Sequence, residues 1–246
     1  MATYARRLWL ATVLLGLNTA LARDCYVMQR SGEKLKGTEL AAESDGTLKL
    51  QMEQGGPVQT FKPGTYAYGF VPRPPEVEQL DKALEAGKAD TVLQQAAAAF
   101  DKYKYLGWGD HVAYLECLVY VQRKQFDLAQ KAIERGQRYK ARHEDELVKG
   151  SILAMLGLKQ MDQAKPLLEK MMKSEDEGAA AFSFNVRGSI LAQEGKKKEA
   201  ALEYLKTLLL FKPGTVKVER DEARRAVVAL LKETGDPRAA EFEKTP

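Results

Sequence analysis

Two stretches of the sequence are nearly identical: Val148–Ala154 reads VKGSILA and Val186–Ala192 reads VRGSILA. Each is followed by a glycine, Gly157 or Gly195, and then by a segment in which apolar residues return every three or four positions. This spacing places apolar side chains on one face of an α-helix, and a glycine between two such segments marks a turn. The repeated stretch therefore predicts two copies of a helix–turn–helix unit.

Helical spacing continues on both sides of these copies, from Glu76 to the end of the chain. A small residue near the start of each second helix, Ala129, Ala164 and Ala200, recurs at intervals of 35 and 36 residues. A period of this length is typical of stacked helical hairpins. We expect three such units, with weaker helical pairs before and after them.

The last of these units resembles the tetratricopeptide repeat (TPR), a helix–turn–helix of about 34 residues with recurring aromatic, small and alanine positions. Thr207 stands where the family has a second small residue, and the closing proline comes about one residue late. The resemblance implies a mainly α fold, an α-solenoid of TPR-like hairpins over residues 76–246. It is carried by Phe184, Gly188, Leu191, Gly195, Ala200, Tyr204 and Pro213.

Residues 23–71 have the period-two pattern of β-strands instead. Thr47–Glu53 alternates apolar and polar residues, and Asp45-Gly46 before it is typical of a tight hairpin turn. Lys36–Ser44 should therefore be the partner strand. The pattern predicts a small antiparallel β-sheet or SH3-like barrel, the latter a resemblance that rests on strand count. Flanking strands are expected at Tyr26–Gln29, Val58–Phe61 and Tyr66–Val71.

The first 22 residues have the pattern of a secretory signal peptide. Arg6 and Arg7 precede an apolar run, Leu8–Leu17, and Ala20–Ala22 supplies the small residues that a signal peptidase recognises. The run is shorter than the roughly 20 apolar residues that span a bilayer. We expect cleavage after Ala22 and an exported chain, periplasmic or secreted, without stable membrane insertion.

The predicted organisation has a stiff joint, because residues 72–75 read PRPP and proline fixes the backbone angle φ.

Export would place Cys25 and Cys117 where a disulfide can form if their Cα atoms lie within about 7 Å. The favoured alternative is that Cys117, in an apolar stretch, is a core residue. The expected segments are a signal peptide (1–22), a small β domain (23–71), a Pro-rich linker (72–75) and a TPR-like domain (76–246).

Composition and motifs exclude several classes of function. The formal charge of +4 falls to +2 without Arg6 and Arg7, which argues against a nucleic-acid partner. The sequence has no nucleophile-elbow, phosphate-loop or zinc-protease motif. His111 and His143 lie 32 residues apart, without the nearby carboxylate or cysteine spacing of a metal site. We therefore expect no catalytic residues, no cofactor and no metal.

The TPR resemblance implies a protein or peptide ligand along the face formed by the first helix of each hairpin. The positions that map to this face are His111, Tyr114, Lys149, Asn185 and Ser189. A concentration of aromatic residues around a Gly-Trp-Gly loop has two interpretations, core filling or a patch at the rim that contacts a partner. The residues that would form such a patch are Tyr103, Tyr105 and Trp108.

Together these patterns predict an exported, non-enzymatic scaffold that binds a protein or peptide in the cell envelope. One alternative is that the β domain recognises the ligand, a cell-wall glycan or an envelope peptide, while the helices form a homo-oligomer. A second alternative is an accessory subunit of an envelope enzyme.

Overall fold

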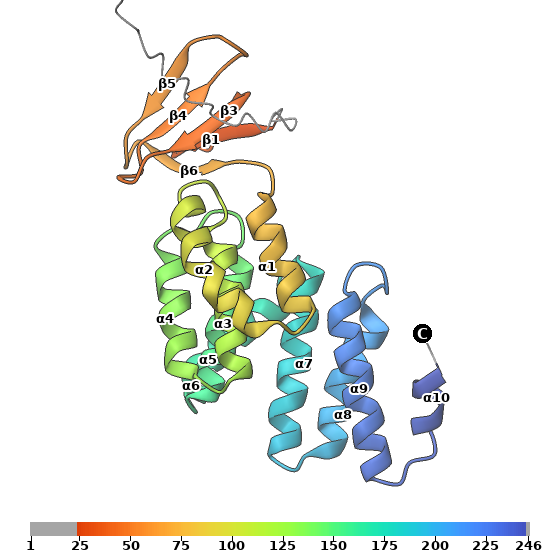
Figure 1. Cartoon of the computed structure of the whole chain (residues 1–246). Coiled ribbons are helices and arrows are strands. Elements are labelled where there is room, and N and C mark those ends of the chain that lie inside the picture. The colour runs from red at the N-terminus through yellow and green to blue at the C-terminus, as the bar shows by residue number, and fades with distance from the viewer. Residues whose placement is uncertain (1–23, 245–246) are drawn as a thin grey trace, which may run out of the picture.

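The structure, a computed structural model, describes residues 24–244, so the predicted signal peptide lies outside them. The described chain is mainly α, about 60% helical, with two small antiparallel sheets at its N-terminal end. Figure 1 shows the strands grouped at one end of the molecule and the helices following one another away from them. The mainly α prediction is therefore confirmed.

The β part consists of two three-stranded sheets with strand orders β2-β1-β6 and β3-β4-β5. The hairpin at Asp45-Gly46 is confirmed: β3 and β4 pair antiparallel, and the Asp45 carboxylate accepts a hydrogen bond from the Thr47 N–H at 2.8 Å. The strands are β1 (Cys25–Gln29), β2 (Lys34–Gly37), β3 (Glu39–Ala42), β4 (Leu48–Gln51), β5 (Val58–Phe61) and β6 (Tyr66–Phe70).

The prediction of one strand over Lys36–Ser44 is wrong. The segment is divided at Thr38, because β2 pairs with β1 in one sheet and β3 pairs with β4 in the other. Gly37 makes this change of sheet possible: a side chain there would collide with the backbone oxygen of Gln51 and the side chain of Leu50. A residue with a Cβ atom would therefore push β2 away from β4.

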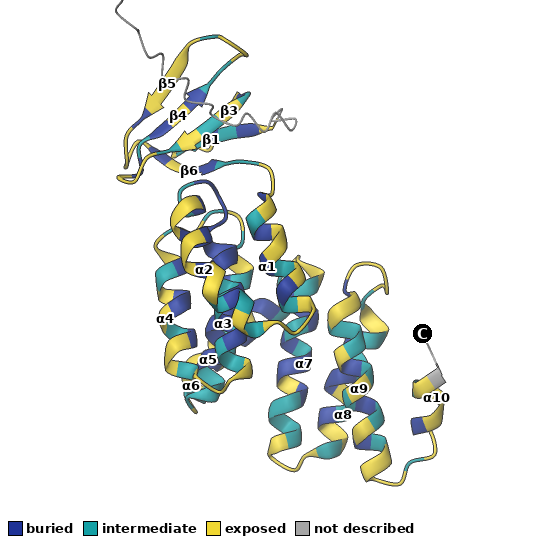
Figure 2. Cartoon of the chain, viewed as in Figure 1, coloured by how far each residue is buried: buried dark blue, intermediate teal, exposed yellow. Residues whose placement is uncertain are grey.

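The β part rests directly on the helices. The β6 strand continues its hydrogen bonding onto the loop after α2: Gly69 N–H donates to the Tyr105 carbonyl at 3.0 Å, and Val71 N–H to that of Leu106 at 3.3 Å. The indole N–H of Trp108 donates to the Val71 carbonyl at 2.9 Å. Strand and helix residues share one buried apolar cluster, and Figure 2 shows buried residues where the two parts meet. The Pro-rich linker therefore connects two parts that are already packed together.

Each helix packs on the next, and the odd-numbered helices from α1 to α9 also contact one another in succession. No helix within residues 24–244 combines the length and apolar character needed to cross a bilayer. The helices are α1 (Pro75–Glu85), α2 (Ala89–Tyr103), α3 (Gly109–Gln122), α4 (Phe126–Gln137), α5 (Glu144–Gly157), α6 (Met161–Met172), α7 (Glu177–Gln193), α8 (Lys197–Leu210), α9 (Lys217–Glu233) and α10 (Ala239–Lys244).

Glycines in the repeated stretches allow close helix packing. A side chain on Gly150 of α5 would meet Ile133 of α4, and one on Gly188 of α7 would meet the Tyr204 ring of α8. Gly195 adopts a positive φ of 78° in its turn, as expected. Gly157 instead ends α5, where a side chain would collide with the ring of Phe126. Gly157 and Gly195 therefore hold the same position in the two copies for different reasons, close packing in the first and a turn in the second.

We expect Gly150→Ala to lower the free energy of unfolding by about 1–3 kcal/mol, because the added methyl group forces Ile133 out of a filled core. Gly214→Ala is the matched control, since space is open around Gly214 and its φ is not positive. That variant should match the parent or exceed it by about 0.4–1 kcal/mol. Urea unfolding followed by circular dichroism measures both, and equal stability of the two variants would contradict this account of the repeat.

Candidate functional site

The five residues expected to bind a partner lie on odd-numbered helices, as mapped, but the polar side-chain atoms of His111, Lys149 and Asn185 have intramolecular partners. Lys149 Nζ lies 3.4 Å from Oε1 of Glu219, and the Asn185 amide donates to the Glu219 carbonyl at 2.8 Å. Asn185 is buried and also accepts a hydrogen bond from the Thr207 hydroxyl at 2.8 Å. Ser189 is half-buried. These contacts fasten the start of α9 onto α5 and α7.

Tyr114 and His111 belong to the same helix, α3, and neither is exposed. Burial raises the pKa of the Tyr114 phenol, and the negative charges of Glu146 and Glu219 raise it further. Tyr114 therefore stays neutral at physiological pH and can act only as a hydrogen-bonding or apolar group.

The aromatic residues around the Gly-Trp-Gly loop pack inside the protein. Tyr103 and Trp108 are buried, and Tyr105 is half-buried with its ring edge-on to Tyr139 at a centroid distance of 5.3 Å. Cys25 and Cys117 are buried free thiols, and Cys117 belongs to the main apolar cluster. The core interpretation of Trp108 and Cys117 is therefore confirmed, and the aromatic loop supports the β part.

A group of charged and aromatic side chains joins the linker to α1, α3 and α5. His111 donates from Nδ1 to Oε2 of Glu146 at 2.6 Å and from Nε2 to Oδ1 of Asp81 at 2.9 Å. Arg73 pairs with the other oxygen of Asp81. We call this group the junction cluster; it comprises Arg73, Asp81, Trp108, Asp110, His111, His143 and Glu146.

Asp110 holds the backbone of the cluster in place. Its Oδ1 accepts the N–H of His111 at 2.9 Å. Its Oδ2 accepts three consecutive N–H groups, those of Ala141, Arg142 and His143, at 2.8, 3.0 and 2.9 Å. Asp110 is completely buried. One carboxylate thus binds the backbone at the starts of both α3 and α5, which fixes the distance between His111 and His143.

His143 completes the cluster from the start of α5. Its ring lies 4.9 Å from that of His111 and 5.2 Å from that of Trp108, measured between centroids. Its Nδ1 is 3.6 Å from Oε1 of Glu146. Its Nε2 is buried and has no hydrogen-bond partner within the described residues. Both histidines of the chain therefore face the same glutamate.

The cluster holds opposite charges at neutral pH. Burial alone would lower the pKa of His111, but hydrogen bonds to Asp81 and Glu146 outweigh it and raise the pKa to about 9. Burial likewise opposes ionisation of Glu146, yet hydrogen bonds from His111 and His143 lower its pKa to about 2. A buried imidazolium between two carboxylates results.

Sequence reasoning missed this cluster, although a signal was present. Asp81, His111 and Glu146 follow one another at 30 and 35 residues, close to one repeat, and His143 precedes Glu146 by three positions. Stacked hairpins bring equivalent positions of successive first helices together, and residues three apart share a helix face. The wide separation of the histidines was therefore compatible with contact.

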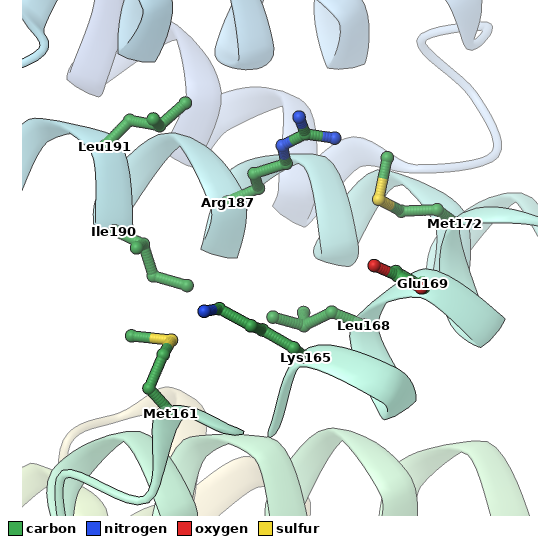
Figure 3. Close-up of a pocket in the computed structure, with 8 residues that line it drawn as sticks. All are labelled: Met161, Lys165, Leu168, Glu169, Met172, Arg187, Ile190 and Leu191. Carbon is green, nitrogen blue, oxygen red and sulfur yellow. The ribbon is translucent and has the colours of Figure 1, made fainter. Parts of the chain in front are cut away.

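A second candidate site lies on α6, α7 and α8. Between α6 and α7 a hollow is lined mainly by apolar side chains, and Figure 3 shows Lys165 extending across it toward Met161 and Ile190. Two of its residues, Arg187 and Leu191, also line the next hollow, between α7 and α8. The lining of the first hollow is Met161, Lys165, Leu168, Glu169, Met172, Arg187, Ile190 and Leu191.

Helix α8 exposes leucines beside these hollows. Leu202, Leu209 and Leu210 are 61%, 78% and 64% exposed, and Leu205 lies between them, half-buried. Leu202 and Leu205 continue into a third hollow between α8, α9 and α10. We call this continuous strip the leucine surface; it comprises Ile190, Leu191, Leu202, Leu205, Leu209 and Leu210.

The two copies of the repeated stretch differ at this surface. Ile152 of the first copy is completely buried, whereas its counterpart Ile190 is half-buried and lines a hollow. Both isoleucines belong to the same apolar cluster, in which Ile152 is a buried member and Ile190 lies at the edge.

A fourth hollow, lined by charged and aromatic side chains, lies between the β part and the helices. Arg30, Lys104, Arg138 and Lys140 surround it. Its aromatic lining consists of Tyr66, Tyr68, Tyr105 and Tyr139.

The comparisons with known proteins add no relative to this picture: no protein-family model matches the chain, and no curated protein matches it in sequence.

Proposed function

We propose that the chain is an exported, non-enzymatic binding protein: a TPR-like α-solenoid carrying a small SH3-like β module, which docks a helical segment of a partner protein. The observation that carries the proposal is the leucine surface. Leu202, Leu205 and Leu209 follow one another at i, i+3 and i+7, the spacing at which one helix packs against another. Soluble monomers rarely expose such a contiguous apolar strip.

The surroundings of the leucine surface indicate the chemistry of the partner. Charged side chains of both signs line the hollows beside it. The basic ones are Lys165, Arg187, Lys197, Lys198, Lys206 and Arg238, and the acidic ones are Glu169, Glu199, Glu203 and Asp236. Methionines in the α6–α7 hollow can adjust to different apolar shapes. We therefore propose an amphipathic helix whose apolar face meets the leucines and whose flanks carry charged residues of both signs.

Cross-linking in the native cell tests the location of docking. A photo-reactive side chain replacing Leu209 should capture one partner reproducibly, whereas the same group at Ser189, on the odd-numbered helices, should capture none. Capture only from Ser189 would move docking to the face expected from the TPR resemblance. Capture only from the exposed Lys49 in β4 would move it to the β module.

Replacing Leu202 and Leu209 together by glutamate should weaken binding to that partner at least about 100-fold, because both charges would have to be buried on docking. The free energy of unfolding should change by no more than about 0.5 kcal/mol for each site, since both side chains are exposed. Val218→Glu is the matched control, because Val218 is 75% exposed on α9. Titration calorimetry measures affinity, and undiminished binding by the double variant would contradict the proposal.

Export is tested separately by N-terminal sequencing of the protein recovered from its native compartment. Cleavage of the signal peptide predicts Arg23 as the first residue. A retained Met1 would show that the segment is not removed and would contradict the export proposal.

A second candidate function is favoured by the fourth hollow, between the β module and the helices. Four basic side chains and four tyrosines there are suited to a carboxylated or sulfated glycan, with charges meeting cations and sugar rings lying on aromatic faces. Arg138→Glu should abolish glycan retention on an affinity column if this function holds. If columns carrying heparin and polygalacturonate both fail to retain the parent chain, the glycan-binding function is excluded.

A further inference from the structure

We propose that His111, His143 and Glu146 form a zinc-binding site, with Asp81 as the carboxylate that orients His111. One nitrogen of each imidazole and one oxygen of Glu146 lie within 4.8 Å of one another. These are the only two histidines of the chain. Two imidazoles and one carboxylate are a donor set that Zn²⁺ favours, with a fourth position left for water.

The distances are close to those of a coordinated ion. His111 Nδ1 and Glu146 Oε2 are 2.6 Å apart, and His143 Nδ1 is 3.6 Å from Glu146 Oε1. Zinc ligands lie about 2.0–2.2 Å from the metal, which sets neighbouring donor atoms about 3.3–3.5 Å apart in a tetrahedron. An ion at this place would displace the proton that now lies between His111 and Glu146, which passes to solvent, and His111 would then bind as a neutral imidazole. The pair would need to separate by less than about 1 Å.

The groups behind the three ligands hold them as zinc sites require. Asp81 Oδ1 accepts a hydrogen bond from Nε2 of His111 at 2.9 Å, which leaves Nδ1 as the nitrogen that faces Glu146. A carboxylate on the far nitrogen of a ligating histidine fixes the ring and strengthens the ligand. Asp110 fixes the backbone of both histidines, because its carboxylate accepts hydrogen bonds from their N–H groups at the two helix starts. These donors therefore do not face an incoming cation.

Charge and access also fit a divalent cation. Asp81, Asp110 and Glu146 place three carboxylates around the histidines, and Arg73 offsets one of them. The side chains of His143 and Glu146 remain 21% and 28% exposed, which leaves a path from solvent. An ion here would join α3 to α5 and, through Asp81, to α1. The proposal is independent of the leucine surface, which lies on other helices.

Titration of the purified chain, stripped with a chelator, tests the site. We expect one Zn²⁺ per chain with a dissociation constant of about 1 μM or below. Co²⁺ in its place should give the strong visible absorption of a four-coordinate ion. Because the chain has only two histidines, zinc should move the imidazole signals of both in nitrogen-detected magnetic resonance spectra. This readout needs no variant.

Variants then assign the ligands. His143→Ala and Glu146→Gln should each lose binding at least about 100-fold, and Asp81→Asn, a positioning variant, should weaken it about 10–100-fold while keeping the cobalt spectrum. Glu144→Gln is the control, because Glu144 is exposed and pairs with Lys140. No saturable binding at about 100 μM Zn²⁺, unmoved histidine signals, or zinc binding that survives both ligand variants would overturn the proposal.

Discussion

Asp110→Ala is expected to lower the free energy of unfolding by roughly 3–5 kcal/mol, the largest single-residue effect that we predict. Asp110 is fully buried and accepts hydrogen bonds from four backbone N–H groups. Removing the carboxylate leaves these donors without their partner, and each unpaired buried donor costs about 1–3 kcal/mol. Chemical denaturation of the metal-free chain measures the loss.

Asp110→Asn removes the negative charge of the side chain but keeps its shape, so it separates the contribution of charge to the free energy of unfolding from that of shape. An amide keeps one acceptor oxygen but has no negative charge, so about half of the loss should remain, roughly 1.5–3 kcal/mol. Asp101→Asn is the matched control, because Asp101 is exposed and pairs only with Lys104 at its surface. That change should stay within about 0.5 kcal/mol. If Asp110→Ala were as mild as the control, the junction cluster would not be the structural centre that we describe.

The stability of the metal-free chain should depend strongly on pH, and this is the second large effect. His111 has a pKa of about 9 in the folded chain against 6.5 when unfolded, so its contribution is complete below pH 6.5 and is lost as the pH rises toward 9. Glu146 has a pKa of about 2 against 4.5, so its contribution is complete above pH 4.5 and is lost as the pH falls toward 2.

Each pKa shift corresponds to roughly 3 kcal/mol of the free energy of unfolding. Because His111 and Glu146 titrate as one coupled pair, the two values do not add. The groups that face His111 are Asp81 from α1 and Glu146 and His143 from α5. Unfolding midpoints in urea from pH 2 to pH 10, with a chelator present, give the profile. His111→Gln serves as the reference, and its stability should not fall between pH 6.5 and pH 9. Parallel profiles for parent and variant would show that His111 gains no proton on folding.

The sequence predicts the elements of this fold well because their signals are local. Helical spacing identifies the hairpins, and Asp45-Gly46 identifies the turn between β3 and β4. The division of one expected strand at Thr38 depends on which sheet each half joins, and a long-range pairing of that kind leaves no periodic trace.

The candidate sites were less predictable for the same reason. The sequence predicts the helix that carries His111 but not the partners of its side chain, because Asp81 and Glu146 reach it from other hairpins. Leucines of α8 have the same helical spacing as core residues, so their exposure depends on whether a neighbouring helix covers them. Lys149 and Asn185 were expected to face a ligand, yet Glu219 lies against both.

The most direct test of the central proposal is hydrogen exchange of the chain with and without the partner captured at position 209. Docking on the leucine surface predicts slower amide exchange in α7 and α8, over residues 187–210, with no change in α3 or in the β module. Slower exchange confined to α3 and α5, or to residues 25–70, would contradict it.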